Sequence, residues 1–369
     1  MVSTETTASL NPAASDKGGV GYRWFILGLL AFGAVFAFVD RTNIASALAV
    51  PEFKDHFALT NTARGTINSA FFWAYALLQV PMGWAVDRYG VKIPYAIGIV
   101  VWSVATLIAA FTHTLPELVV ARIIVGAGEA VVVPASYRWI RSNFKENQNG
   151  LAVGIYMLGT KLGPALGPVV SVGLIALYGW PAMFLILGVV GLIWLVPWML
   201  FLKNDLPAGR AKGAVKAKRN EMPFSVILKS PMVWGSIIIN FCYNYFTFYC
   251  MTWMPAYFVE KRGLSLEKMS LFAFFSFVGI AIVALAAGWA ADRMIAAGKD
   301  PVAVRKGFVI AGFVVACTEL LGILTTNEQM ALFWAVVSLS GLGLATANHL
   351  VLVRLTLIPV QATGRVTGV

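Results

Sequence analysis

The chain has few charged residues for its length. Lys, Arg, Asp and Glu together make up 12% of its 369 residues, whereas 59% are hydrophobic. A soluble domain has about 25% charged residues, so this composition excludes an ordinary soluble protein. It indicates a protein that crosses a membrane several times.

Cysteine and histidine occur only three times each. Cys242, Cys250 and Cys317 lie in apolar runs without metal-ligand spacing, so we expect neither disulfides nor a zinc site. The histidines are scattered, and no Ser-His-Asp set, phosphate-binding loop or soluble catalytic domain is visible in the sequence. The sequence therefore does not predict an enzyme, and we expect no cofactor and no metal.

Long apolar runs are what the sequence has instead. A hydrocarbon core of about 30 Å requires about 20 apolar residues per helix. Ten runs reach that length: 23–48, 63–86, 93–112, 116–138, 149–172, 181–202, 232–255, 268–290, 306–326 and 330–353. The predicted fold class is all-α and integral to the membrane, with ten transmembrane helices.

The formal net charge of +11 is unevenly distributed along the chain. Most Lys and Arg fall in segments that share one side of the membrane with the N-terminus, above all in 203–231. The positive-inside rule therefore predicts a cytoplasmic N-terminus. Residues 1–21 lack the apolar core of a signal peptide, and we expect a disordered cytoplasmic tail. Because position explains the basic charge, no nucleic-acid partner is expected.

The basic segment 203–231 separates the first six apolar runs from the last four. We interpret it as a solvated cytoplasmic linker near anionic lipid, with a regulatory or protein-binding site as the alternative. The hexapeptide 83–88, at the end of the second run, resembles 288–293, at the end of the eighth run. This similarity predicts two homologous halves in parallel repeat.

Several charged side chains lie inside apolar runs: Asp40, Arg41, Arg122, Glu129 and Lys161. A charge at membrane depth costs about 3 kcal/mol and persists only where it faces the bundle interior, a partner or water. Arg122 and Glu129 are almost two helical turns apart and share one helix face. We interpret them as part of a polar cavity; an internal ion pair that only locks two helices is the alternative.

These motifs together resemble the major facilitator superfamily. The superfamily-wide features are the Gly-x-x-x-Asp-Arg loops at Gly83 and Gly288, the run Arg122-x-x-x-Gly126-x-Gly128-Glu129 and the basic central segment. More specific stretches are similar to its anion:cation symporter branch: Asp40-Arg41-Thr42-Asn43, Gly128-Glu129-Ala130 and Thr252-Trp253-Met254-Pro255-Ala256-Tyr257. The resemblance covers nearly the whole chain from Arg23.

The resemblance implies a two-bundle helical fold with twelve helices. It divides the chain into an N-terminal six-helix bundle at 22–202, the linker, and a C-terminal bundle at 232–369 that holds helices 7–10. The resemblance places the start of helix 11 at 364–369, where the sequence stops. We expect the sequence to be the first part of a longer chain, with a natural lack of helices 11 and 12 as the alternative.

The implied function is import of an organic anion by proton symport through alternating access in the inner (plasma) membrane. Members of the branch import sugar acids, so a hexuronate, aldonate or aldarate is expected first. Small dicarboxylates, aromatic acids and sodium coupling remain open. The expected partners are the anion, protons and the lipid bilayer, and the expected state is a monomer.

Each candidate site residue has an expected role. By resemblance, Asp40 and Glu129 are the proton-carrying carboxylates, and Arg122 is the cation that stabilises them when ionised. Arg41 is the first candidate for binding the substrate carboxylate, because its guanidinium is always charged and offers a planar fork. Further candidate substrate contacts are Asn43, Tyr75, Gln79, Lys161, Tyr243 and Asn244, with hydrogen bonding between helices as the alternative.

A second set of residues lies at the predicted inner surface: Gly83, Asp87, Arg88, Asp292 and Arg293. We interpret them as a conformational latch whose salt links hold the outward-open state and break when the halves rock. Glu319 and His349 lie in apolar runs without an assigned role.

Two other functions compete with import. The run Gly159-x-x-x-Gly163-Pro164-x-x-Gly167-Pro168 partly resembles the antiporter signature of the same superfamily, although Pro168 replaces a glycine. A proton-linked exporter of drugs or metabolites is therefore the nearest alternative, although three intramembrane cations favour anionic ligands. A membrane sensor that does not transport is the alternative of another class.

Overall fold

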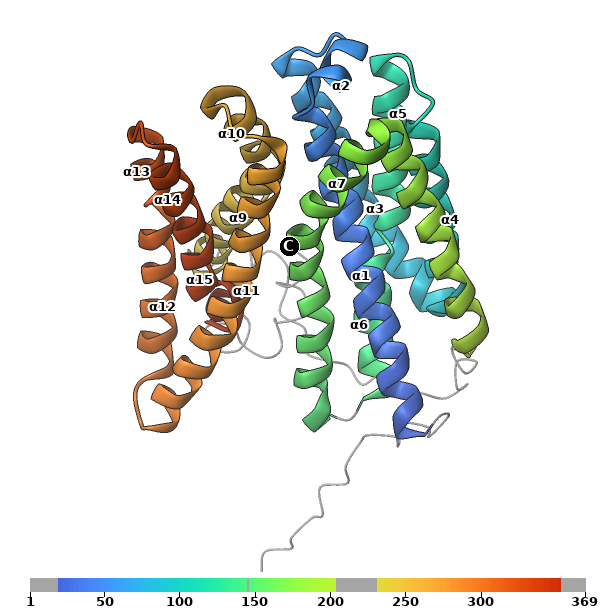
Figure 1. Cartoon of the computed structure of the whole chain (residues 1–369). Helices are drawn as coiled ribbons and strands as arrows, with labels where there is room; N and C mark the ends of the chain where they lie inside the picture. The colour runs from blue at the N-terminus through green and yellow to red at the C-terminus, as the bar shows by residue number, and fades with distance from the viewer. Residues whose placement is uncertain (1–18, 145, 204–230, 353–369) are drawn as a thin grey trace, which may run out of the picture.

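The computed structural model describes residues 19–144, 146–203 and 231–352, in which the regular elements are helices. Most of the predicted tail, most of the predicted linker and the segment 353–369 lie outside the described residues. The described helices form two groups (Figure 1). One group precedes the predicted linker in the sequence and the other follows it.

The first group contains seven helices: α1 (Val20–Leu48), α2 (Pro51–His56), α3 (Asn61–Tyr89), α4 (Lys92–Ala109), α5 (Leu115–Glu129), α6 (Val132–Asn143) and α7 (Glu146–Phe201). The second contains α9 (Pro231–Thr252), α10 (Met254–Arg262), α11 (Leu266–Ala296), α12 (Pro301–Ala316), α13 (Glu319–Leu324), α14 (Glu328–Gly341) and α15 (Gly343–Val351). We call the end of the molecule that holds α2 and α10 the α2 face, and the opposite end, where α1 begins, the N-terminal face (Figure 1).

The ten apolar runs correspond to helical segments. α7 accounts for two of them, because its backbone leaves the helical conformation at Gly179, where φ is +79°. Four other runs each extend over two consecutive helices: α5 with α6, α9 with α10, α12 with α13, and α14 with α15. Among the described residues, seven helices are long and apolar enough to cross a membrane; α3 and α9 are not among them.

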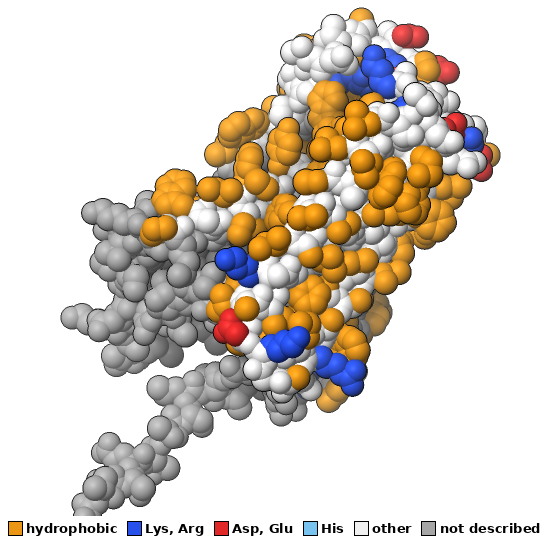
Figure 2. Space-filling view, turned by 90° about the vertical axis from the view of Figure 1, so that its left-hand side faces the viewer, with side chains coloured by type: hydrophobic (Ala, Val, Ile, Leu, Met, Phe, Trp, Pro, Cys, Tyr) orange, Lys and Arg blue, Asp and Glu red, His pale blue; other side chains and the backbone are white. Residues whose placement is uncertain are grey.

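The outer surface is apolar where lipid would contact it. Figure 2 shows hydrophobic side chains over the long middle part of the second group, with charged side chains mainly nearer its two ends. Ile282 and Leu285 on α11 and Ile310 and Val314 on α12 are among the large exposed residues. Because so broad an apolar surface is stable only in lipid, the protein is a multi-pass membrane protein.

Glycines allow α7 to lie directly against α1. A Cβ added to Gly159 would overlap the carbonyl of Ala31, and one added to Gly163 would overlap Phe38. Small residues permit this close approach of helix backbones in membranes, where packing replaces the hydrophobic effect between helices. The glycine run that partly resembles an antiporter signature therefore has a packing role here.

This packing predicts the effect of a larger side chain. We expect Gly163→Val to destabilise the protein by about 1–3 kcal/mol, as overpacking does in other cores. The expected result is a lower Tm of the purified protein in detergent. Gly154→Val is the matched control, because a Cβ at Gly154 meets nothing within 4 Å. Equal Tm values for the two variants would contradict this account.

Candidate functional site

The sequence-predicted charges of α1 and α5 meet inside the first group of helices. Arg41 Nε donates to Glu129 Oε2 at 2.6 Å, and both side chains are buried. Glu129 is the last residue of α5, so its carboxylate lies where that helix ends and α6 begins. The pair joins α1 to α5 within the apolar interior.

Glycines of the Arg122–Glu129 run place α5 against its neighbours. A Cβ on Gly126 would overlap the carbonyl of Phe71 on α3, and one on Gly128 would lie 2.8 Å from the carbonyl of Gly98 on α4. Both glycines therefore allow a close approach that larger residues would prevent. The local sequence of the motif thus fixes the position of Glu129.

Asp40 forms a second buried centre beside this pair. Asn43 Nδ2 donates to Asp40 Oδ1 at 2.6 Å, one turn further along α1. Thr106 Oγ1 on α4 donates to Asp40 Oδ2 at 2.8 Å. Asp40 is 1% exposed, so these two donors replace the solvent that its carboxylate lacks.

Arg122 lies near both carboxylates. It is buried and close enough to both Asp40 and Glu129 to interact electrostatically with them. Its guanidinium carbon lies 4.8 Å from the ring centre of Phe71, and its Nε has no hydrogen-bond partner among the described residues. The hydrogen-bonded ion pair of Glu129 is made by Arg41, whereas the sequence analysis assigned Arg122 to stabilise that carboxylate.

Aromatic rings pack against the Arg41 guanidinium, and part of that guanidinium makes no hydrogen bond within the described residues. The guanidinium carbon lies 4.2 Å from the ring centre of Phe38 and 4.3 Å from that of Tyr75. Arg41 Nη2 and Glu129 Oε1 have no hydrogen-bond partner among the described residues. Gln79, one turn beyond Tyr75 on α3, is half-buried. The ion pair thus carries a buried donor on Arg41 and a buried acceptor on Glu129 that make no hydrogen bond within the described residues.

A second cluster of polar side chains lies where the two halves meet. Lys161 Nζ on α7 lies 3.4 Å from the hydroxyl of Tyr243 on α9. That hydroxyl shares a hydrogen bond of 2.9 Å with Thr346 Oγ1 on α15, and the Tyr243 ring stacks on His349 at 4.7 Å. Within the described part of the chain, no carboxylate makes a salt bridge to Lys161. Here a membrane-depth cation faces hydroxyl and aromatic groups.

Other polar residues of the second half bond locally. Asn244 Nδ2 donates to the backbone carbonyl of Asn240 at 2.8 Å, one turn earlier on α9. Glu319, which had no role in the sequence analysis, accepts a hydrogen bond from Ser338 Oγ at 2.7 Å and is buried. The contact between Glu319 and Ser338 joins α13 to α14.

The predicted latch residues make contacts within their own halves. Arg138 Nε on α6 lies 3.5 Å from Asp87 Oδ1, and Arg305 Nη2 on α12 lies 2.8 Å from Asp292 Oδ1. Arg88 and Arg293 lie against the tryptophan rings of their own helices, Trp84 and Trp289. Gly83 would carry a Cβ 3.9 Å from Pro134. In this structure, each of the two Asp side chains forms its ion pair with an arginine of the same half.

Two neighbours of the charged centre were missed in the sequence analysis. Thr106 is one hydroxyl in the apolar run 93–112, and its sequence position does not reveal that it faces Asp40. Phe38 precedes Asp40 in an apolar run and has no polar group to mark it, although its ring packs on Arg41. The contact of Thr106 joins α4 to α1, whereas Phe38 lies one turn before Arg41 on α1 itself.

Comparison with known proteins gives one family. Residues 30–369 match the family described as Major Facilitator Superfamily. The chain is 30% identical over 347 residues to a hexuronate transporter of Bacillus subtilis, covering 92% of this chain and 78% of the relative. It is 28% identical over 370 residues to a D-galactonate transporter of Escherichia coli, covering 94% and 84% respectively.

Longer relatives and a solved structure agree. A probable chloroplastic anion transporter of Oryza sativa is 30% identical over 304 residues, and the chain spans about half its length, 51%. The fold is similar to the crystal structure of a bacterial homologue of the human lysosomal transporter Spinster, in an inward-facing and unoccupied conformation. The TM-score is 0.78 at 16% identity, covering 95% of this chain and 78% of that one. With a family match over nearly all of its length and transporters as relatives, the chain belongs to the major facilitator superfamily.

Proposed function

We propose that the protein is a secondary active transporter that imports an organic anion together with protons. A sugar acid is the first substrate class, because the named bacterial relatives include hexuronate and D-galactonate transporters. Transport would follow alternating access between the two groups of helices, as inverted or parallel repeats generally permit.

The observation that carries this proposal is the buried Arg41–Glu129 pair with its unused polar atoms. Arg41 Nη2 is free of hydrogen bonds among the described residues while Nε is held by Glu129. A guanidinium fork positioned by one carboxylate can still donate to a second, and a substrate carboxylate fits that geometry. The Tyr75 ring at 4.3 Å supports the guanidinium plane.

Proton coupling is assigned to the two buried carboxylates. Intramembrane Asp and Glu that face the bundle interior commonly mark proton relays. Asp40 and Glu129 are both buried, and Arg122 interacts electrostatically with each. A change in the distance from Arg122 to either carboxylate would change its proton affinity, which is the coupling that symport requires.

We further propose that the protein lies in the plasma membrane with its N-terminus in the cytoplasm. The uneven distribution of Lys and Arg along the sequence supports this orientation. In that orientation the N-terminal face is the inner face, where Asp87 and Asp292 lie, and the α2 face is the outer face.

Lys161 supplies a test of the substrate's charge. If its ammonium binds a second anionic group, Lys161→Gln should reduce uptake of a dicarboxylate sugar acid by about tenfold or more, the effect of losing about 1.4 kcal/mol of binding. Uptake of the corresponding monocarboxylate should change less. The measurement is competition of labelled uptake by matched aldarate and aldonate pairs. Equal losses for both members of a pair would exclude a specific role in binding the second charge.

Direction of transport distinguishes import from export. Energised membrane vesicles of known orientation should accumulate a labelled sugar acid only when the imposed proton gradient points in the same direction as substrate entry. Accumulation driven by the opposite gradient would identify an exporter. A protein that binds the acid but moves none of it would be a sensor.

A further inference from the structure

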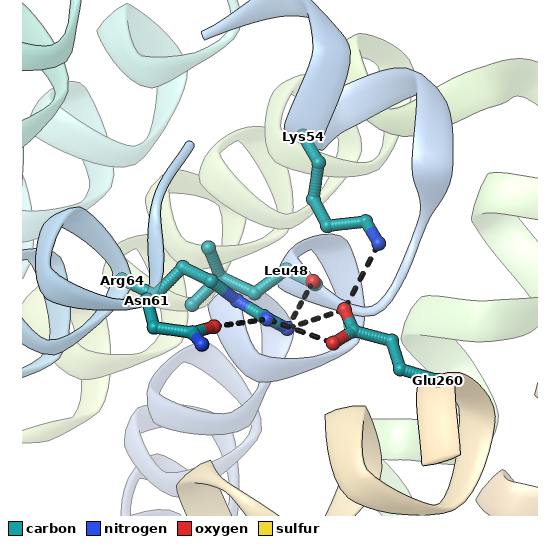
Figure 3. Close-up of polar contacts among 5 residues, drawn as sticks. All are labelled: Leu48, Lys54, Asn61, Arg64 and Glu260. Atoms are coloured by element: carbon teal, nitrogen blue, oxygen red, sulfur yellow. Dashed lines mark hydrogen bonds and ion pairs between the residues drawn. The ribbon is translucent and has the colours of Figure 1, made fainter. Parts of the chain in front are cut away.

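The contact that ties the two halves together on the α2 face is a three-residue ion cluster of Lys54, Arg64 and Glu260. Glu260, on α10, belongs to the second half and accepts the hydrogen bonds of the other two residues. Arg64, on α3, donates to both carboxylate oxygens, at 2.8 Å from Nη2 and 3.0 Å from Nη1. Lys54 Nζ, on α2, lies 2.9 Å from Glu260 Oε1 (Figure 3).

Arg64 is anchored in the first half as well as bonded across to the second. Its Nη2 also donates to the backbone carbonyl of Leu48 at 3.0 Å, and its Nη1 lies 3.3 Å from Asn61 Oδ1 (Figure 3). The Arg64 side chain is 6% exposed, whereas the Glu260 side chain is 25% exposed. A buried guanidinium whose two Nη atoms both bond to one carboxylate forms a stronger and more specific pair than an ordinary surface pair does.

The carboxylate of Glu260 is ionised at neutral pH. Partial burial raises the pKa of Glu260, but hydrogen bonds from Arg64 and Lys54 outweigh this effect, so its pKa lies below the ordinary value. The ion pairs therefore persist over the pH range in which the protein would work.

Apolar contacts between the halves lie on the same side of the molecule. A Cβ on Gly65 would lie 3.7 Å from the Trp253 ring, and the rings of Phe72 and Phe248 are 4.6 Å apart. At the N-terminal face, by contrast, the ion pairs of Asp87 and Asp292 stay within single halves. Among the described residues, the two faces thus differ in whether their ion pairs cross from one half to the other.

We propose that Glu260, Arg64 and Lys54 form a latch that closes the α2 face, and that this latch must break before a ligand can enter from that face. Alternating access is taken from the proposed function, but the latch itself requires no particular substrate. Opening would release Lys54 and Arg64 from their counter-charge together, leaving two cations at the entrance. Such an entrance would attract an anion by its electric field.

The test measures the distance between the halves without any substrate. Spin labels at Thr62 on α3 and Lys261 on α10, both exposed residues, report the separation across the α2 face. The background replaces Cys242, Cys250 and Cys317 with alanine. Double electron–electron resonance on the purified protein in detergent then gives the distance distribution.

Glu260→Gln is expected to shift the ratio of open to closed populations by about tenfold or more, seen as a new longer-distance component. Arg64→Gln should give a similar shift, and Lys54→Gln a smaller one, because Lys54 makes one of the bonds and Arg64 makes two. Each variant is compared separately with the parent protein. If one variant folds poorly, the other two therefore still test the latch.

Glu328→Gln is the matched control. Glu328 pairs with Lys268 at 3.0 Å, and both residues belong to the second half, on α14 and α11. Its distance distribution should equal that of the parent protein. An unchanged distribution in both Glu260→Gln and Arg64→Gln, or an equal shift in Glu328→Gln, would overturn the latch. Failure of anion transport with a normal shift would refute only the proposed function.

Discussion

Replacing Glu129 with glutamine should abolish proton-driven accumulation of the anion. Exchange of internal for external anion across the membrane should stay intact. For one proton carried with a monovalent anion, a pH difference of one unit supports about tenfold accumulation, the ratio that corresponds to 1.4 kcal/mol. In Glu129→Gln the ratio should fall to one. The reason is that an amide keeps a polar group beside Arg41 but cannot carry a proton through a transport cycle.

The measurement compares uphill uptake with counterflow in liposomes. Glu319→Gln is the matched control, because Glu319 is also buried at membrane depth but bonds to Ser338 in the other half. We expect this control to retain accumulation. Uphill uptake by Glu129→Gln at the parent level would remove Glu129 from the coupling mechanism.

Replacing Arg41 with lysine should weaken anion binding by at least about tenfold, or about 1.4 kcal/mol. Lysine retains the charge but lacks the planar fork that reaches Glu129 and a second carboxylate at the same time. It also loses contact with the rings of Phe38 and Tyr75, which lie 4.2 and 4.3 Å from the guanidinium carbon. The effect should therefore appear in Kd rather than only in the transport rate.

Binding of a labelled sugar acid to purified protein provides the measurement. Arg23→Lys, on the same helix, is the control: Arg23 Nη1 contacts the backbone carbonyl of Asn143 at 3.2 Å, outside the charged centre. Its Kd should equal that of the parent protein. Parent-like binding by Arg41→Lys would show that the substrate carboxylate binds elsewhere.

The main features of the fold follow from the sequence because apolar runs of membrane length have one stable solution, the helix. The family resemblance predicted two halves, and the family match and the solved-structure neighbour confirm the fold class. Interruptions within the runs were not predicted. The breaks at Ala130 and Val131, between α5 and α6, occur among apolar residues that give no turn signal.

Part of the site also followed from the sequence. The charged side chains inside apolar runs pointed to a shared polar centre, and the structure brings Arg41 and Arg122 close to Glu129. Which arginine would pair with Glu129 depends on helix rotation and side-chain rotamers, so it could not be read from spacing. Their roles in transport stay predictions.

The ion cluster of the α2 face shows another limit. Lys54 and Glu260 lie between predicted apolar runs and Arg64 lies at the very start of one, and several other charges lie near them in the sequence. Only the packing of α10 against the first half selects Glu260 as the partner of Arg64. Contacts between distant segments of this kind are invisible to periodicity and motif analysis.

The most direct test of the account is whether the anion and the proton move together through the centre formed by Arg41 and Glu129. Purified protein in liposomes that contain a pH-sensitive dye would be given an inward gradient of a sugar acid, without sodium. The account predicts acidification of the interior by the parent protein and none by Glu129→Gln. Anion entry without acidification, or equal acidification by both proteins, would contradict it.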